Sequence, residues 1–155
     1  MIIEKHHRLS PSLYVGKIRV SFTLCINKRK SVFTNKNITE AILSELKKSL
    51  VKYNVINWAY IFMPDHMHIV LEGKEKDSNL LKCLKLFKQF SGYWFSKNIS
   101  GIEWQKDFYD HIHRKEDDLP VHIRYILNNP VRKGLVKDWN DYPFKGSLDN
   151  KLNEI

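Results

Sequence analysis

The chain has few of the features that mark secreted, membrane-spanning or low-complexity proteins. It carries only two cysteines in 155 residues, Cys25 and Cys83, outside any Cys-x-x-Cys spacing, which argues against a zinc ribbon and a disulfide scaffold. Both lie in apolar stretches, so we expect buried core residues in a reducing compartment. No apolar run reaches the roughly 18 residues that span a membrane. The start, MIIEKHHRLSPS, has no apolar signal-peptide core, so we expect a cytoplasmic protein.

Acidic residues are also scarce. Asp and Glu number 17 against 26 Lys and Arg, which gives a formal net charge of +9. This excess favours an anionic partner, with nucleic acid first and an anionic membrane surface second. A basic soluble protein without such a partner is the alternative. The six Gly and five Pro are scattered and no internal repeat is present, which indicates one domain.

Alternation of apolar and polar side chains predicts several strands. Residues 18–26 alternate as expected for a strand with one buried face. Residues 54–63 and 66–72 are rich in apolar and β-branched side chains and predict two antiparallel strands. Pro64-Asp65 suits the tight turn between them. Residues 110–114 fit either a short strand or a turn.

Helical spacing of apolar residues predicts three helices. One covers residues 37–52, with Thr39 or Asn37 as its N-cap. A long amphipathic helix covers 79–97. A third begins within the acidic stretch 116–120 and ends near Asn128, because Pro130 disfavours helical geometry in the residue before it.

His66 and His68 are the first candidate functional residues. In a strand, residues two apart share a face, so both imidazoles project together while Met67 and Ile69 face the core. Two imidazoles on one face can bind a cation. The same pair can also be two hydrogen-bonded polar residues at the start of a strand.

The third helix carries a second candidate group. His122, Tyr125 and Asn129 are spaced i, i+3 and i+7, so they fall within about 60° on the helix wheel. They lie beside an apolar stripe of Leu119, Ile123, Ile126 and Leu127. A helix that lines a cleft would present them in this way. Tyr125 can also be a boundary tyrosine with a buried ring and a hydrated hydroxyl.

Four motifs occur in a fixed order along the chain. They are MPDHMHIV at 63–70, WQKDFYDH at 104–111 followed by Arg114, HIRYILNNPVRKGLV at 122–136, and Trp139 with DYPF at 141–144. Together they resemble the single-tyrosine HUH transposases, in particular the REP-associated tyrosine transposases of bacteria. HUH denotes two histidines that flank a bulky hydrophobic residue. The resemblance covers roughly residues 15–147.

The resemblance implies a fold and a domain organisation. The fold would be a ferredoxin-like α+β sandwich, with a central antiparallel sheet, helices packed on one face, and the catalytic tyrosine on a C-terminal helix. Residues 1–14 would form an N-terminal arm, 15–147 a single catalytic domain, and 148–155 a polar C-terminal tail.

The resemblance also implies a site and an activity. Tyr125 would be the nucleophile. His66, His68 and Asn129 would hold Mg²⁺ or Mn²⁺, with Asn129 where the wider family often has Gln. The enzyme would nick and join single-stranded DNA that carries palindromic hairpins, through a 5′-phosphotyrosine, as a monomer or a homodimer.

This chemistry agrees with general principles. Phosphodiester cleavage develops negative charge, which a metal neutralises as Lewis acid and template. A tyrosine hydroxyl has an ordinary pKa of ~10 and is a weak nucleophile unless it is activated. Two imidazoles by themselves favour Zn²⁺ or Mn²⁺ over Mg²⁺.

Further histidines and basic residues are candidates for supporting roles. His122 is one helical turn before Tyr125 and could orient a phosphate, while His111 and His113 could be supporting or structural. Nine basic residues are candidate DNA contacts, although helix lysines are often only solvated. They are Lys28, Arg29 and Lys30, then Lys82, Lys85 and Lys88, and finally Arg114, Arg132 and Lys133.

Two alternatives from other classes stay open at this point. One is a domesticated DNA-binding or regulatory protein of the same fold that no longer cleaves DNA. The other is an RNA-binding ferredoxin-like module. Such a module would carry paired aromatic residues on its open sheet face, where this chain has His66 and His68.

Overall fold

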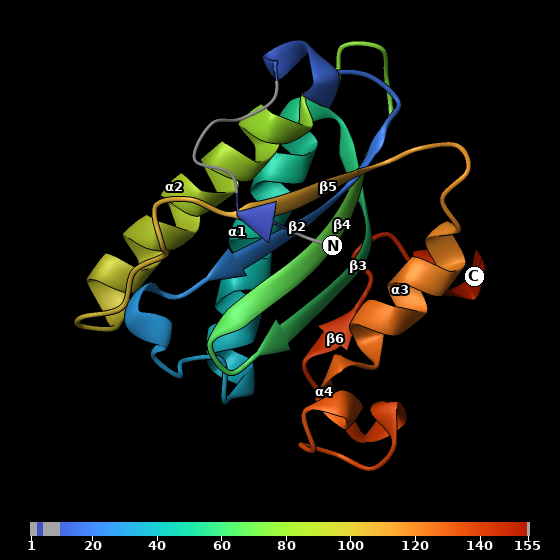
Figure 1. Cartoon of the computed structure of the whole chain (residues 1–155). Helices are drawn as coiled ribbons and strands as arrows, with labels where there is room; N and C mark the ends of the chain where they lie inside the picture. Colours follow the sequence, from blue (N-terminus) through green and yellow to red (C-terminus); the bar gives the residue numbers. More distant parts are fainter. Residues whose placement is uncertain (1–2, 5–9, 155) are drawn as a thin grey trace.

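The computed structural model describes residues 3–4 and 10–154, which form six strands, four α-helices and several short 3₁₀ helices (Figure 1). The strands are β1 (Ile3–Glu4), β2 (Arg19–Cys25), β3 (Val55–Met63), β4 (His66–Gly73), β5 (Tyr109–His113) and β6 (Lys145–Gly146). The α-helices are α1 (Lys36–Tyr53), α2 (Leu80–Asn98), α3 (Leu119–Leu127) and α4 (Asn129–Arg132). Short 3₁₀ helices are η1 (Pro11–Tyr14), η2 (Asn27–Arg29), η3 (Trp139–Asp141) and η4 (Lys151–Glu154).

All the strands belong to one antiparallel sheet. Their spatial order is β1-β5-β2-β4-β3-β6, and each neighbouring pair is antiparallel. The inner part is β2-α1-β3-β4-α2-β5 in chain order, which is the βαββαβ arrangement of ferredoxin-like folds. The predicted α+β fold class is therefore confirmed.

The two long helices cover one face of the sheet (Figure 1). Phe22 and Leu24 of β2 pack with Leu46 of α1 and Phe87 of α2 in one buried cluster. Truncation of such a side chain to alanine typically costs about 2–5 kcal/mol. This cluster fixes the sheet rigidly, and the sheet in turn fixes the residues on its other face.

Helix α3 lies over that other face (Figure 1). Ile123 and Ile126 of α3 pack with Ile61 and Val70 of the β3–β4 hairpin in a second buried cluster. Val70 thus faces α3, whereas Met67, an odd number of residues away, belongs to the cluster under the long helices. The predicted orientation of this strand is confirmed, and His66 and His68 share the face of Val70.

Strand β2 is buried on both faces, not on one as its alternation predicted. Ser21 is 2% exposed and Thr23 8% exposed. Each hydroxyl contacts imidazoles: Ser21 those of His113 and His122, and Thr23 that of His68. Polar side chains can be buried when they are hydrogen-bonded. The polar face of this strand is therefore buried, because its hydroxyl groups are hydrogen-bonded to histidines.

The helix boundaries agree with the predictions to within a few residues, but the cap of α1 does not. Asn35 caps this helix by accepting a hydrogen bond from the backbone N–H of Ile38 at 3.0 Å. Thr39 and Asn37, the predicted caps, lie inside the helix. No helix of the described chain is long and apolar enough to cross a membrane.

The C-terminal segment packs against strand β3 through a bulge. The β3–β4 register shifts between Asn57 and Ala59. The buried Asn57 amide donates to the carbonyls of Ala59 and Val70 and accepts from the N–H of Leu148 at 3.0 Å. Leu152 packs against the cluster under α3. These contacts hold the end of the chain beside α3.

Candidate active site

His66 and His68 open strand β4 on the face covered by α3. Their ring centroids are 4.9 Å apart, with the planes at 89°. Each ring is anchored through Nδ1: that of His66 lies 2.7 Å from Asp65 Oδ1, and that of His68 lies 2.8 Å from Thr23 Oγ1. Anchoring of Nδ1 orients Nε2 as the potential ligand atom of each ring.

Burial favours the neutral form of both imidazoles. Burial lowers the pKa of His66, although the hydrogen bond to Asp65 acts in the opposite direction. Burial, together with the nearby charges of His66 and Arg132, lowers the pKa of His68 to about 3. The neutral imidazole is the form that binds metals, so the pair is in a ligating state.

Asn129 comes from the junction of α3 and α4. Pro130 follows at the start of α4, where its missing N–H and preset φ are tolerated. Asn129 is 7% exposed, and its amide nitrogen lies 3.3 Å from Nε2 of His68. The tyrosine helix and the histidine strand therefore meet at this amide.

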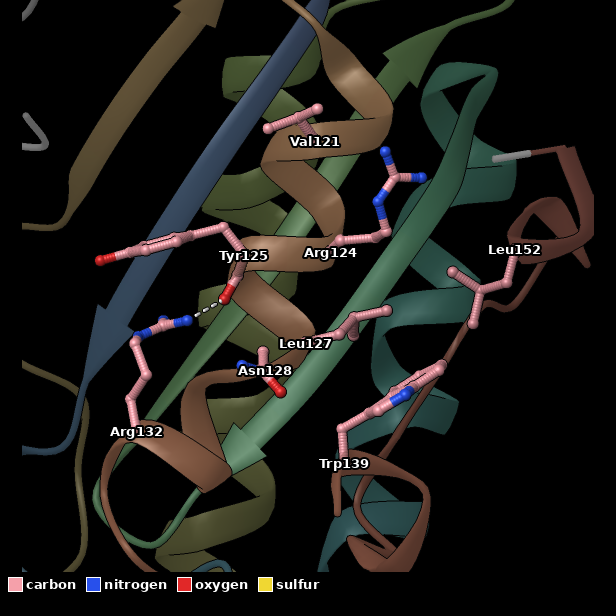
Figure 2. Close-up of a pocket in the computed structure, with 8 residues that line it drawn as sticks. All are labelled: Val121, Arg124, Tyr125, Leu127, Asn128, Arg132, Trp139 and Leu152. Atoms are coloured by element: carbon pink, nitrogen blue, oxygen red, sulfur yellow. Dashed lines mark hydrogen bonds between the residues drawn. The ribbon is translucent and has the colours of Figure 1, made fainter. Parts of the chain in front are cut away.

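Tyr125 is 62% exposed and lies against Arg132. The guanidinium carbon is 3.7 Å from the centroid of the tyrosine ring. Nη1 of Arg132 donates to the carbonyl of Tyr125 at 2.6 Å, the dashed line in Figure 2, and Nη2 lies 3.4 Å from Oδ1 of Asn129. Arg132 thus holds a positive charge between Tyr125 and Asn129.

A cavity of about 840 Å³ joins these side chains. The lining residues come from η2, β4, α3, α4 and the turn after α4. They are Arg29, His66, His68, His122, Tyr125, Ile126, Asn129, Arg132 and Lys133. The predicted nucleophile and the three predicted metal ligands all line one space.

The donor set around this cavity fits a divalent cation. Two neutral imidazoles and an amide oxygen suit Mn²⁺ or Zn²⁺ and are less typical of Mg²⁺. The oxygen of Asn129 faces Arg132 and its nitrogen faces His68. Coordination through the oxygen therefore requires the amide to rotate about its last bond.

A second cavity of about 680 Å³ flanks α3. Figure 2 shows the ring of Tyr125 extending from α3 on the side away from Trp139 and Leu152. Trp139 is 39% exposed. Its indole therefore offers an accessible aromatic surface next to the tyrosine helix.

Only three of the nine candidate basic residues line the active-site cavity. Arg132 and Lys133 do so from the segment after Asn129, and Arg29 does so from η2. Arg29 also donates to Oδ2 of Asp65 at 2.9 Å, so it supports the anchor of His66.

The other six basic residues lie apart from this cavity. Lys82, Lys85 and Lys88 are on α2, which covers the opposite face of the sheet (Figure 1). Lys88 donates to the carbonyls of Gln105 and Lys106 and thus serves the fold. Lys30 donates to the carbonyl of Gly101, and Lys28 and Arg114 are exposed.

Sequence reasoning missed two residues that orient the histidines. Asp65 was interpreted only as a turn residue, although its position directly before the motif was an available signal. Thr23 lies opposite His68 in the β2–β4 register. Nothing local marks Thr23, because register depends on the pairing of distant strands.

The candidate supporting histidines lie in two places. His122 lines the active-site cavity, and its Nε2 lies 3.0 Å from Oγ of Ser21. His111 lies beside Asp117 instead, with 3.2 Å between Nε2 and Oδ2. His113 connects the two groups through Ser21, with 2.7 Å between Nε2 and Oγ.

The ferredoxin-like sheet thus brings a histidine pair and a tyrosine of the covering helix to one cavity. Residues 14–129 match the family described as "Transposase IS200 like". The chain therefore belongs to the IS200-like family of transposases.

Comparison with individual relatives indicates which group of transposases within this family the chain resembles. The chain is 31% identical over 135 residues to a Haemophilus influenzae protein assigned as a REP-associated tyrosine transposase, covering 79% of this chain and 76% of that protein. It is 36% identical over 87 residues to the Escherichia coli REP-associated tyrosine transposase, covering 56% and 50%. The resemblance predicted from the motifs is confirmed.

Solved structures agree with this fold. A REP-associated tyrosine transposase bound to a REP hairpin aligns with a TM-score of 0.74 at 24% identity, over 92% of this chain and 82% of that one. A transposase-like protein from Deinococcus radiodurans aligns with a TM-score of 0.53 at 17% identity, over 81% and 96%.

Proposed function

We propose that this transposase nicks and joins single-stranded, hairpin-containing DNA with Tyr125 as the nucleophile. In this proposal His66, His68 and Asn129 hold a divalent metal. One observation carries it: Tyr125 of α3 lines the same cavity as the histidine pair of β4. An exposed tyrosine that shares a cavity with two imidazoles fits such a reaction.

The reaction exchanges one phosphate ester for another. The Tyr125 oxygen attacks phosphorus and the P–O3′ bond breaks. Tyr125 gives up its hydroxyl proton to solvent as the new bond forms, and the leaving O3′ takes up a proton from solvent. The products are a 5′-phosphotyrosine and a strand with a free 3′-hydroxyl. Attack by another 3′-hydroxyl reverses the exchange and releases Tyr125. No ATP is needed, because the phosphotyrosine keeps the energy of the original bond.

A bound Mg²⁺ or Mn²⁺ would act as Lewis acid and template for the phosphate. Side chains of the protein orient the metal ligands and contact the tyrosine and the phosphate. Thr23 and Asp65 keep both Nε2 atoms in position. Arg132 lies against the ring of Tyr125 and offers a cation to the phosphate that the tyrosine attacks.

The DNA strand follows the positive charges around the cavity. Arg29, Arg132 and Lys133 line it and are placed to contact phosphates. Trp139 in the neighbouring cavity can stack on a base of the same strand. The relative that was solved with a REP hairpin supports a hairpin substrate.

The decisive experiment measures covalent adducts. Purified protein is incubated with hairpin-containing single-stranded DNA from its own genomic flanks and with Mn²⁺ or Mg²⁺, then separated under denaturing conditions. We expect an adduct from the wild type and none from Tyr125→Phe. Tyr93→Phe is the matched control, because Tyr93 is 66% exposed but lies on α2.

A chelator should abolish the adduct, and Mn²⁺ should restore it. Wild-type protein that binds the hairpin without forming an adduct in any metal would refute the proposal. That result would favour the non-cleaving DNA-binding protein of the same fold.

A further inference from the structure

A second group of metal-ligating side chains lies outside the active-site cavity. His111 and His113 are two residues apart on β5 and share a face, and Asp117 follows in the next turn. Nε2 of His111 is 3.2 Å and Nδ1 of His113 is 3.9 Å from Oδ2 of Asp117. The three ligand atoms lie within 4.8 Å of one another.

At the centre of this group, one ring nitrogen of His113 is buried without a hydrogen-bond partner among the described residues. Its side chain is 2% exposed, and its buried Nδ1 has no hydrogen-bond partner among the described residues. A buried polar atom of this kind is uncommon and calls for a structural reason. The 3.9 Å to Asp117 is too long for a hydrogen bond.

The hydroxyl of Ser21 affects which ring nitrogen of His113 carries the proton. It lies 2.7 Å from Nε2 of His113 and 3.0 Å from Nε2 of His122, and it has a single proton to donate. When Ser21 donates to His122, the proton of His113 is on Nε2. The lone pair of Nδ1 then lies 3.9 Å from Oδ2 of Asp117, and a cation between these two acceptors would satisfy both.

We propose that His111, His113 and Asp117 form a second metal site, suited to Zn²⁺ and separate from the His66–His68 cavity. Two imidazoles and one carboxylate with an open fourth position are a common zinc ligand set. The inference does not depend on the proposed transposition chemistry.

Two of the three ligand separations are already close to those that a zinc ion needs. Bonds of about 2.0–2.1 Å in a tetrahedron place ligand atoms roughly 3.3–3.4 Å apart, near the observed separations from Asp117 of 3.2 and 3.9 Å. Burial and the neighbouring charges of His122 and His111 lower the pKa of His113 to about 4, so its ring is a neutral ligand. Ser21 would orient that ring from outside the site.

The ion also has a route into the site. The side chains of His111 and Asp117 are 37% and 32% exposed. The buried His113 thus forms the inner wall of the site, and its two partners form an opening to solvent.

A metal at this site would stabilise the start of α3, the helix that carries Tyr125. Asp117 directly precedes Asp118, whose side chain caps α3 by accepting from the N–H of Val121 at 3.1 Å. A cation that joins Asp117 to β5 would fix the start of α3, which carries His122 and Tyr125. We therefore assign the second site a positioning role.

The test uses protein without the histidine pair of the active site. The His66→Ala/His68→Ala variant is stripped with a chelator and titrated with Zn²⁺, and with Co²⁺ as a spectroscopic probe. We expect one tightly bound equivalent, the visible absorption of coordinated Co²⁺, and slower hydrogen exchange of α3 amides on metal addition. Adding Asp117→Asn or His113→Ala should abolish all three.

Matched variants distinguish this site from other groups that could bind Zn²⁺. Glu116→Gln removes a neighbouring exposed charge and should keep the bound Zn²⁺. His6→Ala/His7→Ala removes two histidines that are neighbours in the sequence, and this variant should also keep the bound Zn²⁺. Ser21→Ala should weaken Zn²⁺ binding by about 10-fold, because it removes the outer partner of His113.

Two results would overturn the second site. One is the absence of a bound equivalent in the His66→Ala/His68→Ala variant. The other is an equivalent that survives Asp117→Asn, which changes a partly exposed residue and therefore tests the site even if His113→Ala disturbs folding. Failure of the transposase proposal would appear as lost adduct formation and would leave these titrations unchanged.

Discussion

At His68, the hydroxyl of Thr23 determines which ring nitrogen faces the cavity. It holds Nδ1 at 2.8 Å, so Nε2 points toward Asn129. Asp65 does the same for His66 through a carboxylate. Neighbours of this kind commonly set both the orientation and the basicity of a metal-binding imidazole.

Thr23→Val tests this anchor, because it removes the hydroxyl and keeps the shape of the side chain. We expect Mn²⁺ to bind the active-site cavity about 10–100-fold more weakly, because the ring of His68 loses its orientation. Isothermal titration in the Asp117→Asn background isolates this site. Thr39→Val, at a buried threonine on α1, is the control and should bind Mn²⁺ normally.

Tyr142 supports stability through a single buried hydroxyl. It donates to the carbonyl of Phe62 and is 6% exposed. Burial raises its pKa from 10.0 to about 12. Its contribution to stability is therefore complete below pH 10 and is lost as the pH rises toward 12.

Tyr142→Phe should lower the free energy of unfolding by about 1 kcal/mol at pH 7, because a buried carbonyl loses its partner. It should also make the alkaline loss of stability less steep. Urea denaturation at pH 7 and between pH 10 and 12 measures both. Equal slopes for the two proteins would show that Tyr142 ionises as freely in the folded chain as in the unfolded one.

At the scale of elements, α3 is a short helix that depends on its surroundings. Nine residues are too few for a stable isolated helix. Asp118 caps its start, and Ile123 and Ile126 bury one side against the sheet. Packing thus places Tyr125 on the wall of the cavity that the histidine pair of its own chain also lines.

This placement predicts that the tyrosine acts within its own chain. A mixture of Tyr125→Phe and His66→Ala proteins should give no more adduct than either protein alone, because no chain has both functional groups in one cavity. Denaturing gels with labelled hairpin DNA measure this. Recovery of adduct in the mixture would instead indicate exchange of α3 between two chains, as in a homodimer.

At the scale of the whole molecule, the net charge of +9 is divided between two faces. Arg29, Arg132 and Lys133 surround the active-site cavity. The exposed Lys82 and Lys85 lie on α2, on the opposite face of the sheet. Total charge attracts DNA at long range, whereas only charges in contact with phosphates displace counterions.

Lys133→Gln should therefore reduce the salt dependence of single-stranded DNA binding, with a change of about 0.7 in the slope of log affinity against log salt. Lys85→Gln should leave that slope unchanged, although it removes the same charge. Fluorescence anisotropy over a series of salt concentrations measures both. Equal effects of the two substitutions would place the DNA on both faces.

Much of the fold followed from short-range patterns. The alternation in residues 18–26 and 66–72 predicted strands β2 and β4, and apolar spacing predicted α1 and α2. Residues 110–114 stayed ambiguous between strand and turn, because β5 is short and its pairing with β1 and β2 makes it a strand. The cap of α1 was misplaced because several polar residues near its start can act as caps.

The sequence by itself determined the longer helices and strands, the excess of positive charge and the motifs that identify the family. Each depends on residue type and spacing, which are local properties. Only the tertiary structure decided that Thr23 orients His68, that Arg132 lies on Tyr125, and that Asp117 meets His113. These contacts depend on strand register and on helix packing, which arise from burial of apolar side chains distant in the chain.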